Sequence, residues 1–247
     1  MRVAVLSDIH ANLRALDAVL GQVGTVDAVW HLGDVVGYGP DPDAVVARLR
    51  ELGARGVRGN HDLAATGDDV IRDFNVDART AMEWTRRTIS PATREWLAAL
   101  PPRLTIGDWS LVHGSPRDPT WEYILSEQAA AENLALIPSP FGLFGHTHLP
   151  IAYVVSGGAN RRPQARIETI VPDAGTTLAI SAARGLVNPG SVGQPRDGDP
   201  RASALVLDLD AGRITWLRAG YDIAATQRAM RAAGLPARGV SRLALGI

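Results

Sequence analysis

The sequence predicts an α+β fold of the α/β type, with two β-sheets packed together and helices outside, in one domain spanning residues 1–247. Three observations carry this prediction. The first half of the chain alternates apolar strands with helices whose apolar residues recur every three or four positions. From residue 103 onward, short strands are separated by Gly, Pro, Ser and Asn. A chain of 247 residues, 46% of them hydrophobic, is long enough to bury a sizeable core.

The N-terminal half supplies the alternating elements. Residues 2–7 form a continuous apolar run, as expected of a strand buried on both faces. Asn12 is placed to cap the helix that follows. Residues 27–33 predict a second strand, and residues 54–62 a short strand with a loop. Between and after these we expect a helix with Val45, Val46 and Leu49 on its apolar face, and two helices over 75–100 that are broken at Ser90-Pro91.

The C-terminal half predicts mostly strands. A hairpin turning at Gly107-Asp108 begins it, and a second hairpin turns at residues 210–212. Five short strands lie between these hairpins, and one helix over 222–234 follows them. Strands in both halves with helices around them favour two packed sheets rather than one.

Composition excludes several classes of protein. The net charge of −1 argues against bulk attraction to nucleic acid or to an anionic membrane. No apolar run reaches the roughly 18–20 residues that span a bilayer, and the N-terminal run reads as a strand rather than a signal peptide. The chain has no cysteine, which excludes disulfides and thiolate metal ligands. By default we expect a cytoplasmic protein.

Polar side chains follow five apolar strands at the point where each strand ends. These motifs are Asp8-Ile9-His10, Gly33-Asp34, Gly59-Asn60-His61-Asp62, His113-Gly114 and Gly145-His146-Thr147-His148. In open α/β sheets, binding residues gather beyond the carboxyl ends of strands, so we expect the five segments to meet in one cleft. They contain five of the six histidines. Any one of them alone is more simply explained as a turn or a packed side chain.

Two further expectations concern the histidines. His146 and His148 are separated by one residue, which places both on one face if the segment is extended; the same holds for Asp8 and His10. The sixth histidine, His31, lies within a predicted strand, and we interpret it as a packed or supporting side chain.

The number of candidate ligands indicates more than one metal ion. The motifs offer two carboxylates, one amide and four imidazoles: Asp8, His10, Asp34, Asn60, His113, His146 and His148. A catalytic metal usually takes about three protein ligands, so two ions sharing one carboxylate fit this set better. Mixed imidazole and oxygen ligands suit Mn, Fe, Zn, Co or Ni better than Mg or Ca.

In their order and spacing, the segments SDIH, LGDVVGYGP, RGNHD, HGSP and GHTHLP resemble the five conserved blocks of calcineurin-like metallophosphoesterases. Residues 188–203, NPGSVGQPRDGDPRAS, further resemble the small bacterial and archaeal phosphodiesterase branch of that family. The resemblance implies a four-layer αββα sandwich, the metallo-dependent phosphatase fold. It also implies a dinuclear metal centre at the edge of the two sheets.

The resemblance implies a role for each site residue. One metal would be bound by Asp8, His10 and His148, the other by Asn60, His113 and His146, with Asp34 bridging both. A hydroxide bridging the metals would attack phosphorus, and His61 would protonate the leaving alkoxide as general acid. The family usually has glycine where this chain has Ala11, which can shift the local turn but leaves the ligands unchanged.

Two neighbouring residues have open interpretations. Asp62 either orients His61 or caps the helix that follows it. Arg58 either clamps a phosphate oxygen as part of the substrate site or is an ordinary arginine. Tyr38 stands where protein phosphatases of the superfamily carry an arginine, which argues against a phosphoprotein substrate.

The expected activity is hydrolysis of phosphodiesters, and of phosphomonoesters as well, with a small-molecule phosphoester or nucleotide as the partner. A nucleotide-specific hydrolase, acting on dinucleoside polyphosphates or cyclic nucleotides, is the alternative. An aromatic platform would favour it, and Tyr38, Trp121 and Tyr123 are candidates. A binding scaffold without activity is a third interpretation, disfavoured because all seven ligand positions are intact. Homo-oligomerisation is compatible with the sequence.

Overall fold

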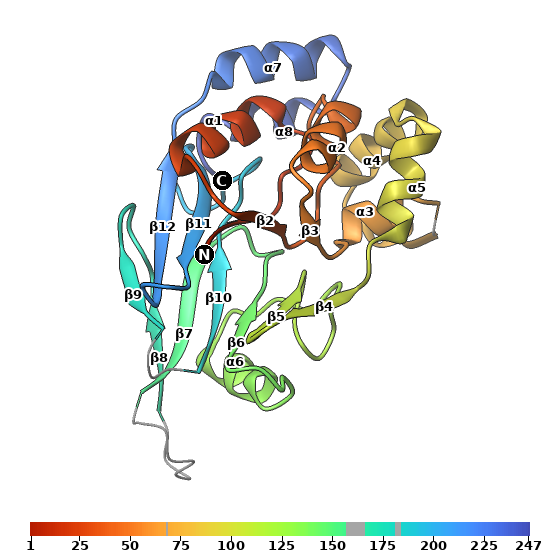
Figure 1. Ribbon diagram of the computed structural model, residues 1–247. Helices are drawn as coiled ribbons and strands as arrows, with labels where there is room; N and C mark the ends of the chain where they lie inside the picture. Colours follow the sequence, from red (N-terminus) through yellow and green to blue (C-terminus); the bar gives the residue numbers. More distant parts are fainter. Residues whose placement is uncertain (68, 157–165, 181–183) are drawn as a thin grey trace.

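Two mixed six-stranded sheets lie face to face at the centre of the molecule (Figure 1). In this computed structural model, which describes residues 1–67, 69–156, 166–180 and 184–247, the strand order is β3-β2-β1-β11-β12-β9 in the first sheet and β4-β5-β6-β10-β7-β8 in the second. The predicted pair of packed sheets is confirmed.

The first sheet combines parallel and antiparallel pairs. Strand β1 pairs in parallel with β2 and antiparallel with β11. Its strands are β1 (Arg2–Leu6), β2 (Ala28–His31), β3 (Arg55–Gly56), β9 (Thr177–Ala179), β11 (Ala202–Asp208) and β12 (Arg213–Ala219). The short parallel strands β1, β2 and β3 all end toward the same edge of this sheet.

The second sheet follows the same scheme. Strand β6 pairs in parallel with both β5 and β10, while the flanking pairs are antiparallel. Its strands are β4 (Arg103–Ile106), β5 (Trp109–Val112), β6 (Phe141–Leu143), β7 (Pro150–Ser156), β8 (Arg166–Ile170) and β10 (Gly185–Pro189). The hairpin predicted at Gly107-Asp108 joins β4 and β5.

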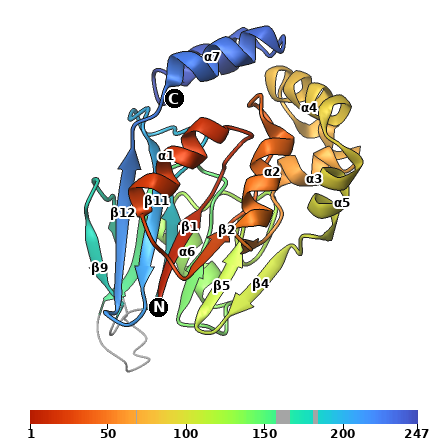
Figure 2. The same cartoon turned by 45° about the horizontal axis from the view of Figure 1, so that its top comes forward.

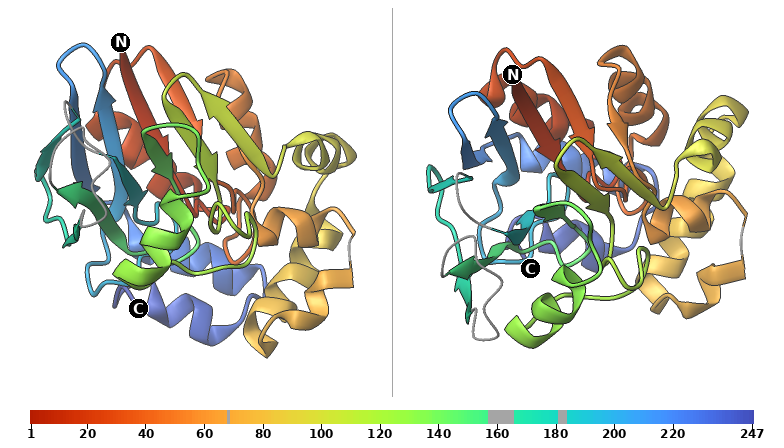
Figure 3. Two further views of the ribbon diagram at one scale, coloured as in Figure 1. Left: turned by 90° about the horizontal axis from the view of Figure 1, so that it is seen from below. Right: turned by 60° about the horizontal axis from the view of Figure 1, so that its bottom comes forward.

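Helices form the two outer layers. Figure 2 shows α1 (Leu13–Val23) and α2 (Pro42–Glu51) over the first sheet, and Figure 3 shows α6 (Glu127–Leu134) against the second. The predicted four-layer αββα sandwich is therefore confirmed. A side group made of α3 (Asn60–Ala65), the 3₁₀ turn Asp69–Asp73, α4 (Val76–Thr88) and α5 (Pro91–Ala99) projects beside the sheets.

Apolar side chains fill each space between the layers. Between the sheets lies a cluster that includes Trp30, Trp109, Leu111 and Trp216. A second cluster packs α1 and α2 on the first sheet, and a third packs α6 on the second. None of the helices in the described part of the chain has both the length and the apolarity that a bilayer crossing requires.

Most local predictions are confirmed, and three need correction. Asn12 caps α1 by accepting a hydrogen bond from the Ala15 amide at 3.2 Å. The loop predicted around Asn60 is instead the first turn of α3. The helix predicted over 222–234 is α7 (Ile223–Ala232), whereas α6 and α8 (Ala237–Arg242) were not predicted. These missed helices are short, so their apolar periodicity is weak.

Candidate metal centre

The five polar motifs meet at one edge of the two sheets. All eight residues predicted as ligands or general acid are at most 5% exposed: Asp8, His10, Asp34, Asn60, His61, His113, His146 and His148. Strands β1 and β2 of one sheet and β5 and β6 of the other end here, and α3 starts here. Residues far apart in the chain are thus gathered around one small volume.

One group of side chains forms around Asp8. The Nε2 atoms of His10 and His148 are 3.2 Å apart. The Asp8 Oδ1 atom lies 3.3 Å from Nε2 of His148 and 4.0 Å from Nε2 of His10. These three residues each direct one ligand atom toward a common point, within 4.8 Å of one another.

A second group forms around His113. Its Nε2 atom lies 3.0 Å from Nδ1 of His146, 3.1 Å from Oδ1 of Asn60 and 3.4 Å from Oδ2 of Asp34. The same Asp34 oxygen is 3.7 Å from Nε2 of His10, in the first group. Asp34 therefore lies between the two groups, the position that a bridging carboxylate needs.

Hydrogen bonds on the outer side fix which ring nitrogen faces the site. The Nδ1 atoms of His10, His113 and His148 contact main-chain carbonyl oxygens of Val36, Leu32 and Gln194 at 3.2, 2.8 and 2.5 Å, respectively. A carbonyl oxygen only accepts, so these Nδ1 atoms carry a proton, and in the neutral ring Nε2 turns a lone pair inward. His146 is reversed, with Nε2 on the Trp121 carbonyl at 3.2 Å and Nδ1 inward.

This donor set fits divalent metal ions. Burial lowers the pKa of both His10 and His148, so their rings are neutral, and their inward lone pairs repel one another unless a cation lies between them. The Asp8 Oδ1 atom is buried and has no hydrogen-bond partner among the described residues. Buried, unpartnered oxygen beside unprotonated ring nitrogen is the chemistry of a metal site rather than of a packed core.

The loops that carry these residues are not extended. Asp8, His10, Asp34, His146 and His148 have positive φ angles of 51°, 47°, 50°, 65° and 60°. The expectation that one-residue spacing places each pair on one face of an extended segment is therefore wrong. Instead, left-handed residues turn the chain back at each strand end, and main-chain hydrogen bonds hold it there, such as the one from the His10 amide to the Asp34 carbonyl at 2.9 Å.

Burial and mutual charge shift the protonation of the site. Burial lowers the pKa of His113, but the carboxylates of Asp34 and Asp8 outweigh this and raise it to about 9. Burial is the largest influence on Asp8 and raises its pKa to about 6. Burial also lowers the pKa of His146 to about 3. These histidines thus differ widely in proton affinity when no cation is bound.

His61 faces the same cavity, and one of its ring nitrogens lies within 4.8 Å of ligand atoms of His10 and Asp34, although it is not one of the predicted ligands. Its Nδ1 atom lies 3.1 Å from the Met82 sulfur, and its ring packs on Tyr38 and Phe74 at centroid distances of 4.5 and 4.7 Å. Burial lowers its pKa to about 4. Its main-chain amide donates to Oδ1 of Asp34 at 2.9 Å, which ties the start of α3 to the carboxylate between the groups.

Asp62 acts on the main chain. Its carboxylate accepts hydrogen bonds from the amides of Gly59, Val35 and Val36 at 2.9, 2.9 and 3.1 Å. Of the two interpretations of this residue, the structure favours helix capping over orientation of the His61 ring. The same contacts fasten the loop after Asp34 to the start of α3.

A cavity of about 420 Å³ opens over the two groups of candidate ligands. The aromatic candidates Tyr38, Trp121 and Tyr123 all line it, and Phe74 joins them. Tyr123 stacks on His146 with centroids 4.1 Å apart and planes 11° apart. The aromatic wall expected of a nucleotide site is therefore present in outline.

The arginines of the cavity differ from the one predicted. Arg58 is not among the lining residues of this cavity, and its role as a phosphate clamp stays a prediction. Arg196 and Arg242 line the cavity instead. Arg196 lies within the segment 188–203 that was singled out in the sequence, so it could have been proposed from there. Arg242 comes from α8, where the sequence carried no motif.

Comparison with known proteins gives the family. A model of the calcineurin-like phosphoesterase superfamily domain matches residues 1–212. The chain belongs to the calcineurin-like phosphoesterase superfamily. An uncharacterized protein of Methanocaldococcus jannaschii is 32% identical over 228 residues, which cover 90% of this chain and 88% of that protein.

Solved structures support the same conclusion. The crystal structure of a metallophosphoesterase from Sphaerobacter thermophilus is 44% identical to this chain, covers 100% of this chain and 99% of that one, and has a TM-score of 0.89. In sequence alone, without a structural comparison, a symmetrical bis(5'-nucleosyl)-tetraphosphatase of Photorhabdus laumondii is 40% identical over 72 residues, only 27% of this chain and 26% of that enzyme.

His31 lies apart from the two groups of candidate ligands. It is fully buried, tilts against Trp96 with ring centroids 5.6 Å apart, and neither ring nitrogen has a hydrogen-bond partner among the described residues. Burial lowers its pKa to about 4. The interpretation of His31 as a packed side chain agrees with this position.

Proposed function

We propose that this protein is a dinuclear metal-dependent hydrolase of phosphodiesters, with phosphomonoesters as further substrates. One observation carries the proposal: two groups of inward-facing ligand atoms share Asp34 and open into one cavity with His61. Two adjacent cation sites facing one cavity suit a phosphate, which can contact both ions through different oxygens.

The ligand assignment follows the two groups. Asp8, His10 and His148 would hold one ion; Asn60, His113 and His146 would hold the other; and Asp34 would contact both. Mn, Fe, Ni, Zn or Co suits this mixture of imidazole and oxygen. When bound, such ions supply Lewis acidity toward the phosphate oxygens and toward the water that attacks phosphorus.

His61 would act as the general acid toward the leaving alkoxide. Its ring is fixed by Tyr38 and Phe74 and lines the cavity, so a phosphoester there comes within reach of its proton. Burial keeps its pKa near 4 in the metal-free protein. The negative charge of a bound phosphate acts in the opposite direction and favours the protonated ring.

Arg196 and Arg242 would neutralise the substrate. A guanidinium group donates paired hydrogen bonds to phosphate oxygens, and both residues line the cavity. Their charge would favour an anionic ester over a neutral one.

A second candidate is a nucleotide-specific hydrolase. The aromatic wall of Tyr38, Phe74, Trp121 and Tyr123 favours it, because a nucleobase stacks on such rings. The partial similarity to a bis(5'-nucleosyl)-tetraphosphatase points to the same substrate class. The chemistry at phosphorus would be unchanged.

A panel assay tests the proposal. The metal-depleted protein is restored separately with Mn, Fe, Ni, Zn and Mg and assayed on phosphomonoesters, phosphodiesters and cyclic nucleotides. We expect activity on diesters with at least one transition metal, and weaker activity with Mg. Inactivity with every metal on every ester would refute the proposal.

A further inference from the structure

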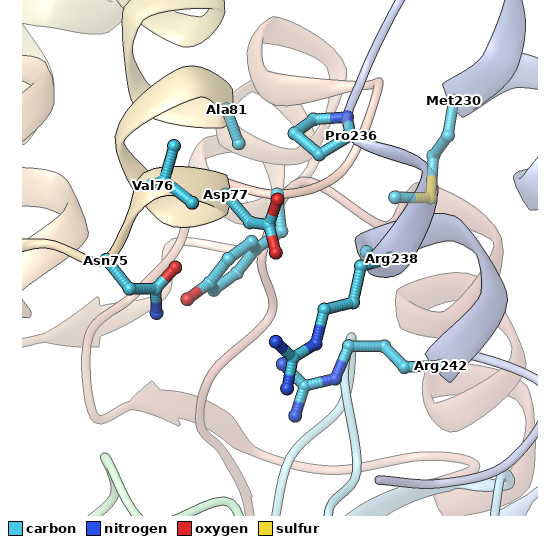
Figure 4. A pocket seen from close by; sticks show the side chains of 10 residues that line it. Asn75, Val76, Asp77, Ala81, Met230, Pro236, Arg238 and Arg242 are labelled. Atoms are coloured by element: carbon cyan, nitrogen blue, oxygen red, sulfur yellow. The ribbon is translucent and has the colours of Figure 1, made fainter.

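A second pocket adjoins the metal cavity. It has a volume of about 190 Å³ and lies between α4 on one side and the pair α7 and α8 on the other (Figure 4). Tyr38, Asn75 and Arg242 line both spaces, so the two are neighbours that share a wall. A substrate held at the metal groups could extend past these residues into the second pocket.

The second pocket is cationic. The guanidinium ends of Arg238 and Arg242 point toward it in Figure 4. Among the described residues, Arg238 has no carboxylate within 4.0 Å, whereas Arg242 donates to an oxygen of Ile247, the last residue of the sequence. Asp77 is the one acidic lining residue, which leaves the lining with a net charge of +1.

The arginines are close enough to repel each other. Burial lowers the pKa of Arg242, and the charges of Arg196 and Arg238 lower it further. Three arginines around one acidic lining residue, Asp77, repel one another, which costs free energy in the folded protein. An anion bound among them removes that cost, so the arrangement favours a ligand with negative charge at this point.

The wall that carries these arginines lies outside the matched family domain. The family model ends at residue 212, whereas α7 and α8 span residues 223–242. A small apolar cluster, made of Ala81, Met230, Leu235, Val240 and Leu243, packs the two helices against α4. The helix that carries Arg238 and Arg242 is therefore held in place by packing against α4.

We propose that this second pocket binds a second phosphate group of the substrate, with Arg238 and Arg242 as its ligands. The substrate would then be an ester that carries two or more linked phosphates, rather than a simple monoester or diester. The inference rests on the proposed function, because the first phosphate is the one bound at the metal groups.

Calorimetry with two phosphate probes tests the proposal. Kd is measured for inorganic phosphate and for imidodiphosphate, whose P–N–P link resists hydrolysis, with the same excess of Mn²⁺ in cell and syringe. We expect wild-type protein to prefer imidodiphosphate by at least about 10-fold, equal to about 1.4 kcal/mol. Arg238→Gln should reduce this preference to less than about 3-fold, because a charge-assisted hydrogen bond is lost.

Two further variants sharpen the test. Arg231→Gln is the matched control, since Arg231 lies on α7, is exposed and lines neither cavity; it should keep the wild-type preference. Asp77→Asn removes the opposing charge and should increase the preference by about 3-fold. Thermal melting of each variant shows that it is folded.

Three outcomes would overturn the proposal: no preference in the wild type, an equal loss in Arg238→Gln and Arg231→Gln, or phosphate binding that depends on Arg238 as strongly as imidodiphosphate binding does. The last would indicate a separate site for free phosphate. Because binding is measured, an Arg238-dependent preference in a protein without hydrolytic activity would refute the proposed function and leave the anion pocket standing.

Discussion

The loops at the candidate metal centre and the hairpin turns at the far ends of the sheets both need positive φ angles, but they place different residues there. The hairpins after β4 and β11 place glycine, Gly107 and Gly212, at the positions of positive φ. Around the site, positive φ falls on residues with side chains: Asp8, His10, Ala11, Asp34, Tyr38, His146 and His148. Among the described residues, these are all the positive-φ positions that are not glycine.

The difference shows what the site requires of the chain. A side chain in the left-handed region costs roughly 1 kcal/mol or more, which glycine would avoid. At five of these seven positions, all except Ala11 and Tyr38, glycine would remove a predicted ligand atom. Such conformations persist because buried main-chain hydrogen bonds surround them, including the Asp8 amide to the Gly33 carbonyl at 3.1 Å.

Replacing the central carboxylate should have the largest effect. Asp34→Asn removes a charged ligand that the proposal assigns to both ions. Mutating a residue that only hydrogen-bonds to a metal ligand typically lowers metal affinity by roughly 10–100-fold. Asp34→Asn should lower it by more than this, because Asp34 is itself a predicted ligand. Metal analysis after dialysis and kcat/KM on a phosphodiester measure this. Asp108→Asn, in the exposed β4–β5 turn, is the control, and an equal metal content in both variants would contradict the assignment.

Removing the general acid should separate chemistry from metal binding. His61→Ala should keep its metal and lose about 10²–10⁴-fold in kcat on an alkyl phosphodiester, whose leaving group needs a proton. On a nitrophenyl ester, whose leaving group is weakly basic, the loss should be smaller. Equal losses on both esters would argue that His61 has another role.

Two glycine substitutions compare the regions directly. A Cβ added at Gly37 would lie 2.4 Å from Nδ1 of His61 and 3.0 Å from the Met82 sulfur, whereas one at Gly107 meets nothing within 4 Å. Gly37→Ala should displace His61 and reduce kcat by about 10-fold or more. Gly107→Ala should leave kcat unchanged and lower the free energy of unfolding by about 1 kcal/mol. Similar kcat values in both variants would contradict the predicted contact.

The smallest expected effect concerns His31 and pH. Its pKa is about 4 when folded, against 6.5 ordinarily, so the unfolded chain binds more protons between these values. Stability should therefore fall as pH drops from about 6.5 to 4, by at most about 3 kcal/mol from this residue. The free energy of unfolding is measured with urea on the metal-free protein. Between these pH values it should fall less in His31→Leu than in the wild type, by that amount. Parallel curves for both proteins would show that His31 does not titrate in this way.

The sequence predicted the layers and the gathering of the site because both depend on local patterns. Apolar runs predicted the strands. The polar residues that directly follow these runs predicted that the site residues gather at one edge of the sheets. It did not predict the left-handed backbone of Asp8 or His146, because only glycine signals that conformation in a sequence. Tertiary hydrogen bonds impose it here.

The arginines show a second limit. Arg58 is close to Asn60 in the chain but does not line the cavity, while Arg196 and Arg242 do. Their approach depends on how the segment after β10 and helix α8 pack, and neighbouring residues in the sequence do not encode that. The candidate ligands were easier to predict because they directly follow short strands, and those strands end at the same edge of the sheets.

The most direct test of the central claim is the metal stoichiometry of two single variants. If His146 and His148 bind different ions, wild-type protein should retain two ions per chain after dialysis. His146→Ala and His148→Ala should each retain about one, because each removes a ligand from one group only. A wild-type protein with one ion, lost equally in both variants, would mean that the two histidines share a single metal and would contradict the account.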